Sequence, residues 1–541
     1  MSLFRNVPRL NALSLAAGLC LLAASHAQAE AWSFGVLGDT QWTKTATAIN
    51  VNTVAVRQIV AANEAFVAAG VKFVMQPGDL GDNGSVASLA TRLAANAALD
   101  AAGIPFYALR GNHDNSSAAI SYFQANYIPT SSASTAVSVM SDGMTYSVAY
   151  NGLKLVMLDY GNTASTTKLP VATTWMGEQL AANDHAHSIV VGHKNLLGQN
   201  HKDNLFGSSN ESNTALQNAF ISTASSGGAR YYIGGHDHMH HRSQVTSPDG
   251  TASLQQIITQ SDSSKWYTPQ SPYSAREAPM AQDLNKIGYY LYTVDGPRLS
   301  AQYYATVPVN SDVADNPIWD WQETFGYSLN GTARLVGEGQ SYAMTHSIAA
   351  GSSHGEDGYV GTAMAILAGV NDVAGTVYGG RSTSQDVNIG WSSRALAGGV
   401  GALSDVLTIW GMESSLGSTQ TDTYALSLSF DATGVSAEAL AAGQVFLAWR
   451  YGSDSFVNAV EGNAGGTASF VLGAYDASYT PGSWGVDLGN GTAWAVVNHG
   501  GDFAVLSTAP VPEPGTWALM LGGLGLLSRR VACRRVAAAR I

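Results

Sequence analysis

The chain has 541 residues, a length that suits several domains rather than one small fold. Only 12% of the residues are charged, 45% are hydrophobic, and 12 Trp, 23 Tyr and 14 Phe are present, which excludes a disordered chain. The net charge of −13 argues against a protein that coats nucleic acid by binding its phosphate backbone.

Residues 1–29 have the three parts of a secretory signal peptide. Arg5 and Arg9 form a basic start, the apolar run Ala12–Ala24 follows, and Ala-Gln-Ala at 27–29 fits a cleavage site. The apolar run is short for a bilayer-spanning helix. We therefore expect residues 1–29 to direct export and to be removed.

The last segment, 511–541, also has three parts. Val-Pro-Glu-Pro at 511–514 precedes the apolar run Thr516–Ser528, and five arginines follow. This arrangement resembles the PEP-CTERM sorting signal of Gram-negative bacteria. The resemblance implies a short transmembrane segment, cleavage by an exosortase, and release to the cell surface or the extracellular space. A plain C-terminal anchor is the alternative.

Removal of the two ends changes the chemistry of the body. The ends hold seven arginines and one glutamate, so residues 30–510 keep 19 basic and 38 acidic residues, a net charge of −19. Both cysteines, Cys20 and Cys533, also lie in the ends. The exported body must therefore fold without disulfides, on its hydrophobic cores or on bound metal.

The body changes character near residue 308. Residues 30–308 alternate short apolar strands with helical patterns, which predicts an α/β domain with parallel strands. The expected strands are 32–37, 71–75, 105–109, 189–191 and 231–233, and the expected helices are 51–69 and 86–102.

Residues 309–510 show strand-like runs between clusters of Gly, Asp, Asn and Ser, which predicts an all-β, sandwich-like domain. The clearest of these runs are 424–430, 444–451, 468–472 and 493–498. The histidines of this part are scattered and indicate no site.

Five polar motifs follow apolar runs in the first domain. Each begins with glycine, which permits a close backbone approach, and each then offers oxygen or nitrogen ligands that divalent metals take. The motifs are Gly38-Asp39-Thr40-Gln41, Gly78-Asp79-Leu80-Gly81-Asp82-Asn83, Gly111-Asn112-His113-Asp114, Gly192-His193 and Gly235-His236-Asp237-His238. Ligands in α/β sheets lie beyond the carboxyl ends of the strands, where these motifs fall.

Together the motifs resemble the calcineurin-like metallophosphoesterase family over residues 31–305. The resemblance implies a four-layer α/β sandwich with two divalent metal ions, of which Mn, Fe and Zn are candidates. It implies Asp39, Gln41, Asp79 and His238 for the first ion, and Asp79, Asn112, His193 and His236 for the second.

Gln41 departs from the family pattern, because the family's first motif usually reads Asp-x-His. An amide oxygen is a weaker ligand than an imidazole nitrogen, which predicts a weaker first ion or a preference for Mn or Fe(II) over Zn. Direct coordination, coordination through water, and no coordination all stay open. Asp82 stands where the purple acid phosphatase branch has its iron-binding tyrosine, which disfavours that branch.

The family chemistry is hydrolysis of phosphate mono- or diesters by a hydroxide that bridges the two metals. His113 is expected to protonate the leaving group as general acid, and Asp114 to orient His113. Asp82 and Asn83 are expected as turn residues around the ligands. His240 and His241 are expected at the surface or around the ligands, and His201 or Lys202 either meets the phosphate or lies in a solvated loop.

Two alternatives concern the function itself. A metallo-β-lactamase-like hydrolase is disfavoured, because His240 occupies the place of its motif's aspartate. A catalytically weak or inactive cell-surface or extracellular-matrix protein, which uses the phosphoesterase fold as a binding module, stays open. The expected partners are a phosphate-ester substrate, exosortase during export, and exopolysaccharide or cell-surface components for the β-rich domain.

Overall fold

The structure, a computed structural model, describes residues 31–41, 55–263, 265–270, 274–306, 317–344, 361–368, 384–397, 401–412, 414–415, 420–433, 435–451 and 455–508. The expected signal peptide 1–29 and sorting signal 511–541 lie outside these ranges. Within the described ranges, none of the helices combines the length and hydropathy that crossing a bilayer requires.

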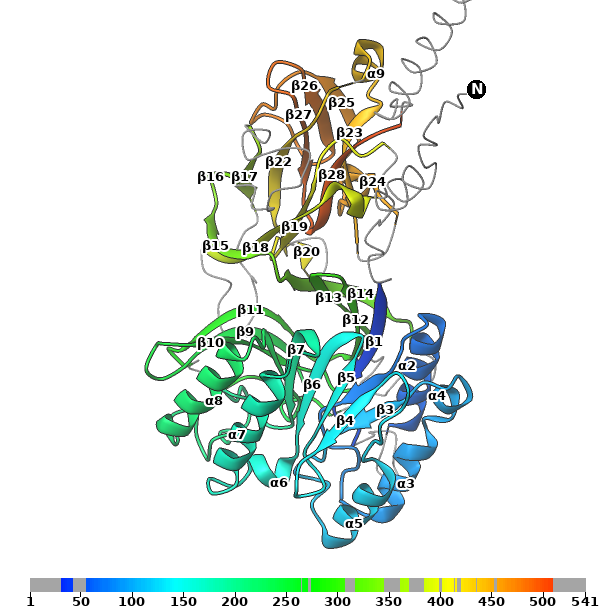
Figure 1. The fold of residues 1–541 in the computed structure, drawn as a ribbon, viewed down its shortest axis with the longest axis vertical. Coiled ribbons are helices and arrows are strands. Elements are labelled where there is room, and N and C mark those ends of the chain that lie inside the picture. The colour runs from blue at the N-terminus through cyan, green and yellow to red at the C-terminus, as the bar shows by residue number, and fades with distance from the viewer. Residues whose placement is uncertain are drawn as a thin grey trace, which may run out of the picture.

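Two mixed sheets form the centre of the N-terminal region (Figure 1). In the first sheet β1, β2 and β3 are parallel, and β1 pairs on its other side with antiparallel β12, followed by β13 and β14. The order is β14 (Asp320–Ser328), β13 (Arg298–Thr306), β12 (Ile287–Asp295), β1 (Trp32–Leu37), β2 (Val74–Gln76) and β3 (Phe106–Ala108). Both faces of β1 are covered, which explains its apolar sequence.

In the second sheet β6, β7, β8 and β10 are parallel neighbours, and antiparallel strands flank them. The order is β11 (Glu277–Asp283), β9 (His240–Thr246), β10 (Ser253–Ile258), β8 (Tyr231–Gly234), β7 (His185–Gly192), β6 (Gly152–Leu158), β5 (Tyr146–Tyr150) and β4 (Ala136–Val139).

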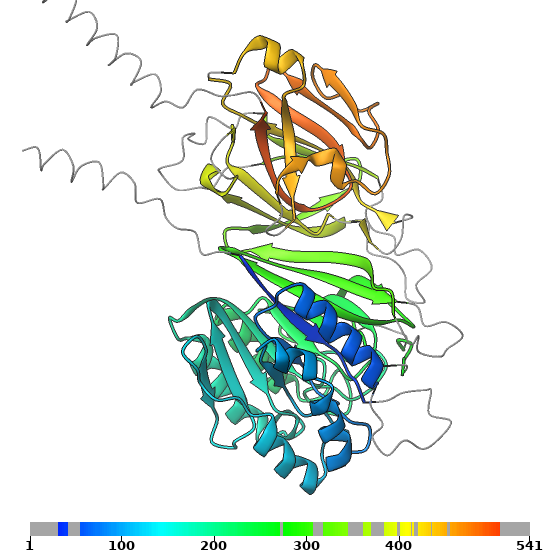
Figure 2. The same cartoon turned by 90° about the vertical axis from the view of Figure 1, so that its right-hand side faces the viewer.

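The two sheets pack face to face, and helices cover their outer faces (Figure 2). Phe34 and Ile189 illustrate the core between the sheets. Phe66 of α2 packs on the first sheet, and Met176 of α7 and Phe220 of α8 pack on the second. The helices are α2 (Val56–Ala68), α3 (Val86–Ala94), α4 (Ala97–Ala101), α5 (Ser117–Asn126), α6 (Tyr160–Thr163), α7 (Leu169–Leu180) and α8 (Thr214–Ser226). The mixed α/β class expected from the sequence is confirmed.

The helix expected over 86–102 is two helices, because α3 ends at Ala94 and α4 begins at Ala97. At the break, the Asn96 side-chain oxygen accepts a hydrogen bond of 2.6 Å from Arg92 Nη1. Asn is a poorer helix former than the alanine and leucine residues around it, which suits a position between two helices.

The described residues of the C-terminal region form two six-stranded sheets around one apolar core. The first has the order β15 (Thr332–Gly337), β18 (Ser384–Ser392), β19 (Val406–Trp410), β28 (Gly501–Ser507), β23 (Val445–Arg450) and β24 (Val457–Asn458). The second has the order β16 (Ser341–Ala343), β17 (Ala363–Ala368), β22 (Thr423–Ser429), β27 (Thr492–Val497), β26 (Ser483–Asp487) and β25 (Ser469–Leu472). The region also contains one short strand pair, one helix and two 3₁₀ turns. These are β20 (Ser414–Ser415) with β21 (Gln420–Thr421), α9 (Ala437–Ala441), η3 (Arg394–Ala397) and η4 (Ala459–Gly462).

The two regions meet at β13 and β14. β14 lies beyond residue 308, yet it pairs with β13 and so belongs to the N-terminal sheet, one strand later than we expected. Buried charges cross the junction: Arg298 Nε lies 3.1 Å from Asp502 Oδ2, and Arg450 Nη2 lies 3.5 Å from Asp295 Oδ2. The division at 308 stays a prediction, and on the strand pairing we propose to move it past Ser328.

Candidate metal centre

The motif residues follow the carboxyl ends of strands in both central sheets. β1, β2 and β3 lead to Asp39, Asp79 and Asn112, and β7 and β8 lead to His193 and His236. The two sheets face each other, so loops from both converge on one place, as expected for a ligand site in an α/β fold.

The first converging group is Asp39, Asp79 and His238, whose ligand atoms all lie within 4.8 Å of one another. His238 Nε2 is 2.9 Å from Asp39 Oδ2, and His238 Nδ1 is 2.8 Å from the carbonyl oxygen of Lys265. A carbonyl only accepts, so Nδ1 carries a proton, and Nε2 is the ring nitrogen that would bind a cation held by this group. The three side chains are buried and able to hold a cation.

The second group is Asp79, His193 and His236, again within 4.8 Å of one another. His193 Nε2 lies 3.3 Å from Asp79 Oδ2 and 2.8 Å from Asn112 Oδ1, so the amide oxygen of Asn112 joins this group. Asp79 belongs to both groups. The structure therefore brings together Asp39, Asp79, Asn112, His193, His236 and His238, and coordination by them stays a prediction.

Two orphaned oxygens support the fit of a cation. Asp39 Oδ1 and Gln41 Oε1 are buried and have no hydrogen-bond partner. Buried polar atoms in proteins almost always have one, and carboxylate and amide oxygens are ligands for hard divalent ions. The donor set is therefore suited to divalent cations, and whether Gln41 binds one stays open.

Three motif glycines make room for the predicted ligands. A Cβ at Gly78 would lie 2.6 Å from His193 Nδ1, and a Cβ at Gly111 or Gly235 would collide with the carboxylate of Asp79 or Asp39. Gly78 also has a φ of +128°, which L side chains rarely adopt. Any side chain at these positions would displace a ligand.

Three of the predicted ligands have left-handed backbone: Asp79 (φ 46°), His236 (φ 69°) and His238 (φ 51°). They are half of the six non-glycine residues with positive φ among those the structure describes. Such backbone costs of order 1–3 kcal/mol per residue and persists only where the surroundings hold it. Its concentration here indicates a functional constraint.

The electrostatics of the second group are those of a cation site. Burial alone would raise the pKa of Asp79, but the nearby imidazoles, His193 first, hold it well below its usual range. Burial alone would lower the pKa of His193, but the charge and hydrogen bond of Asp79 raise it to about 9. The buried carboxylates therefore stabilise positive charge in this pocket.

His113 lies next to the second group. Its backbone N–H donates to Asp79 Oδ1 at 2.9 Å, and its half-buried ring places Nδ1 2.6 Å from the carbonyl oxygen of Asp82. Nδ1–H therefore donates to that carbonyl. The residue that orients His113 is Asp82, through its main chain.

Asp114, which we expected to orient His113, has a different role. Its buried carboxylate accepts hydrogen bonds of 2.9–3.1 Å from the backbone N–H groups of Leu80, Gly81 and Gly111. Burial and the charge of Asp79 raise the pKa of Asp114 to about 7. Asp114 thus holds the second and third motif loops together, and the expected contact with His113 is replaced by these three.

His240 and His241, for which we allowed a surface position, are both fully buried. His240 Nε2 lies 2.6 Å from Glu323 Oε2 of β14, and His241 Nε2 lies 2.8 Å from Glu277 Oε1 of β11. They anchor the start of β9 directly after the predicted ligand His238. Nothing in the local sequence around 240 indicates the distant partner Glu323.

The loop after His193 also reaches the site. His201 Nδ1 lies 2.7 Å from Asp237 Oδ1, and the ring centre of His201 is 4.1 Å from that of His236. Lys202 is exposed. The sequence did not indicate that Lys265 and Tyr267 lie beside His238. The signal for them is the polar stretch that follows the apolar strand 254–258.

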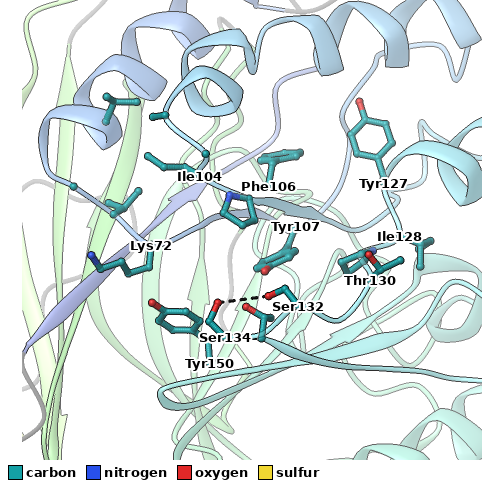
Figure 3. Close-up of a pocket in the computed structure, with 18 of the residues that line it drawn as sticks. Lys72, Ile104, Phe106, Tyr107, Tyr127, Ile128, Thr130, Ser132, Ser134 and Tyr150 are labelled. Atoms are coloured by element: carbon teal, nitrogen blue, oxygen red, sulfur yellow. Dashed lines mark hydrogen bonds between the residues drawn. The ribbon is translucent and has the colours of Figure 1, made fainter.

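A pocket of about 840 Å³ lies away from the candidate metal centre. Figure 3 shows its lining side chains. Lys72, Phe106, Tyr107, Ser132 and Tyr150 are among its lining residues, and none of the predicted ligands is. It is situated around the amino ends of β2 and β3, whereas the motif residues follow their carboxyl ends.

Comparison with known protein families supports the two resemblances found in the sequence, the phosphoesterase motifs and the C-terminal sorting signal. Residues 33–240 match the family model for calcineurin-like phosphoesterase, and residues 510–536 match the PEP-CTERM protein-sorting motif. No curated protein matches the chain.

Solved structures similar to this one include phosphatases. The purple acid phosphatase PPD1 from yellow lupin (Lupinus luteus) seeds is 12% identical, with a TM-score of 0.41, over 56% of this chain and 54% of that chain. PhoD is 12% identical, with a TM-score of 0.39, over 56% of this chain and 70% of that chain. A dimetal phosphatase from Danio rerio is 14% identical, with a TM-score of 0.33, over 50% of this chain and 95% of that chain. The match thus spans about half the length of the lupin protein. On the two family matches, the chain carries a calcineurin-like phosphoesterase region at 33–240 and a PEP-CTERM sorting motif at 510–536.

Proposed function

We propose that the chain is an exported hydrolase of phosphate mono- or diesters that works with two divalent metal ions. The observation that carries the proposal is that two buried ligand groups share Asp79. A shared carboxylate suits two closely spaced cations that act on one phosphoryl group. The calcineurin-like match supports a phosphate-ester substrate.

The predicted ligands divide between two ions around Asp79. The first ion would be held with Asp39, Gln41 and His238, and the second with Asn112, His193 and His236. When bound, such ions supply an activated water molecule and neutralise phosphoryl oxygens. The acidic body makes this local positive charge necessary, because the surface at large repels an anionic substrate.

His113 is the proposed general acid. Its Nδ1 is engaged by the Asp82 carbonyl, so Nε2 is the nitrogen that can pass a proton to the leaving oxygen. Its side chain is 30% exposed, which lets a substrate reach it. A positioned general acid typically accelerates such a step about 10²–10⁴-fold.

The sorting motif indicates exosortase-dependent export in a Gram-negative bacterium. We propose removal of 1–29 and of the C-terminal tail, which places the acidic body at the cell surface or outside the cell. Exopolysaccharide or surface components as partners of the β-rich region belong to the same proposal.

Metal analysis combined with an activity panel tests the proposal. The wild-type protein should bind two divalent ions per chain and should hydrolyse a phosphomonoester or a phosphodiester. Asp79→Ala should lose both ions and the activity, whereas His113→Ala should keep both ions and lose about 10²–10⁴-fold in kcat. Metal-loaded wild-type protein that is inert on both ester classes would favour the binding-module alternative and overturn the proposal.

A further inference from the structure

Lys265 links the two halves of the candidate metal centre. It follows β10, outside the matched residues 33–240, and its carbonyl oxygen accepts the 2.8 Å hydrogen bond from His238 Nδ1. Its Nζ lies 3.5 Å from Asp82 Oδ1, and the same oxygen lies 3.5 Å from His113 Nδ1. One residue therefore has its main chain behind a predicted ligand and its ammonium group beside the proposed general acid.

Two neighbouring side chains, Lys194 and His201, lie closer to carboxylates than Lys265 does. Lys194 Nζ lies 2.5 Å from Asp203 Oδ2, and His201 Nδ1 lies 2.7 Å from the buried Asp237. The 3.5 Å contact of Lys265 is longer, and its side chain is 22% exposed. The side chain also hydrogen-bonds Tyr267, so a substrate anion can recruit the charge of Lys265 without breaking a short ion pair.

Tyr267 limits where the Lys265 side chain can go. Its ring centre lies 4.9 Å from that of His238 and 4.7 Å from that of His201, so the ring forms a wall beside the predicted ligands. Lys265 Nζ lies 6.0 Å from the centre of the same ring. The wall and the anchored carbonyl keep the ammonium group on the His113 side of the centre.

We propose that Lys265 binds a terminal oxygen of the substrate phosphoryl group and selects dianionic phosphomonoesters over diesters; this rests on the proposed function. A phosphomonoester has three terminal oxygens and a charge of about −1.5 to −2 at pH 7. A diester has one charge, and an ester substituent replaces the third terminal oxygen. An ammonium group beside the phosphoryl site therefore stabilises the monoester more.

The test compares Lys265→Met with wild-type protein, both loaded with Mn²⁺, on 4-nitrophenyl phosphate and methyl 4-nitrophenyl phosphate. Loss of a hydrogen bond between charged groups should lower kcat/KM for the monoester roughly 10- to 100-fold and change the diester value less than about threefold. The affinity for inorganic phosphate, measured by calorimetry, should fall by a similar factor while the number of bound Mn²⁺ ions is unchanged.

Lys202→Met is the matched control, because Lys202 is an exposed lysine one residue from His201. Lys202→Met should leave kcat/KM for both esters and the phosphate affinity unchanged. Lys265→Arg, which keeps the positive charge, should restore part of the monoester preference. Three results would overturn the assignment. They are an equal fall in kcat/KM for both esters, an unchanged kcat/KM in Lys265→Met, or a selective fall for the monoester in Lys202→Met instead.

The two proposals fail in different ways. Wild-type protein that binds no metal or hydrolyses neither ester counts against the proposed function. If it binds metal without turnover, the phosphate affinities of wild type and Lys265→Met still decide the role of Lys265. An active wild type whose variant keeps its ester preference and phosphate affinity refutes only the Lys265 inference.

Discussion

Two buried histidines, one in each region, have pKa values shifted in opposite directions. His193 lies 3.3 Å from the carboxylate of Asp79, which raises its pKa to about 9. His499 has only backbone carbonyls at its ring nitrogens, Ala459 at 2.8 Å and Gly500 at 3.3 Å, and burial lowers its pKa to about 4. Burial of a histidine therefore does not define a site; the carboxylates around it do.

The same contrast separates the regions as wholes. Among the residues the structure describes, both three-residue groups with metal-ligand geometry lie in the N-terminal region and include Asp79. In the C-terminal region, the buried carboxylate of Asp502 faces the guanidinium group of Arg450 rather than an imidazole. Variants in both regions can test whether this difference governs metal binding.

The largest effect is expected from His193→Ala compared with His499→Gln. Loss of His193 removes an imidazole from the second group, so metal content should fall from two ions toward one, and kcat/KM should fall about 10³-fold. His499→Gln should leave both quantities within about twofold of wild type. Metal analysis and steady-state kinetics measure this, and similar losses in both variants would contradict the comparison.

Next is Glu323→Gln, which changes the buried partner of His240. Glu323 also pairs with Arg242, and both of its partners lie on β9 directly after His238. Loss of the charge should destabilise the fold by about 3 kcal/mol. Because His238 is held in left-handed backbone, Mn²⁺ affinity should also fall roughly 10- to 100-fold.

Asp502→Asn is the control for Glu323→Gln, because it alters a buried acid paired with Arg298 and Arg450 at the junction of the regions. Asp502→Asn should lower the free energy of unfolding but leave the Mn²⁺ affinity unchanged. Calorimetry measures the affinity. Tyr290→Phe, which removes a hydroxyl 2.9 Å from His240 Nδ1, is a milder second variant if Glu323→Gln does not fold. Unchanged Mn²⁺ affinity in both site variants would show that the His240 contacts serve stability alone.

Sequence patterns predicted where the central strands and their polar motifs lie, because these depend on neighbouring residues, although β2 begins at Val74 rather than 71 and β7 at His185 rather than 189. The strands at Trp32–Leu37 and Tyr231–Gly234 agree closely with the apolar runs, and the glycines of the motifs lie where ligand side chains approach the backbone. The periodicity over 86–102 did not reveal the break at Asn96 between α3 and α4.

What the sequence did not predict depends on contacts between distant segments. The partner of His240 is 83 residues away, and Lys265 reaches the site only because β10 ends beside β8 and its loop meets His238. The partner of His113 is a backbone carbonyl, which no residue type indicates. These features follow from tertiary packing, so a linear pattern cannot contain them.

The pH dependence of stability is the third prediction, and it concerns His499. Burial keeps His499 neutral in the folded state, with a pKa of about 4 against 6.5 in the unfolded chain. Between these values the unfolded state binds more protons, so stability is lost as pH falls from 6.5 to 4, by about 3 kcal/mol. His499→Gln should remove this part of the pH dependence. Urea unfolding at several pH values, followed by tryptophan fluorescence, measures the effect.

The smallest effect is expected from Gln41→His, which restores the imidazole usual in the first motif of the family. Imidazole binds first-row transition metals more strongly than an amide oxygen, so the weaker of two Mn²⁺ affinities should tighten about tenfold, and Zn²⁺ should gain more. Gln41→Ala is the matched variant and separates the open roles. Weaker binding in Gln41→Ala means that the orphaned Oε1 faces the ion, directly or through water. Unchanged binding in both variants means that the oxygen is buried for packing alone, and then only the carboxylates and histidines distinguish this region from the C-terminal one.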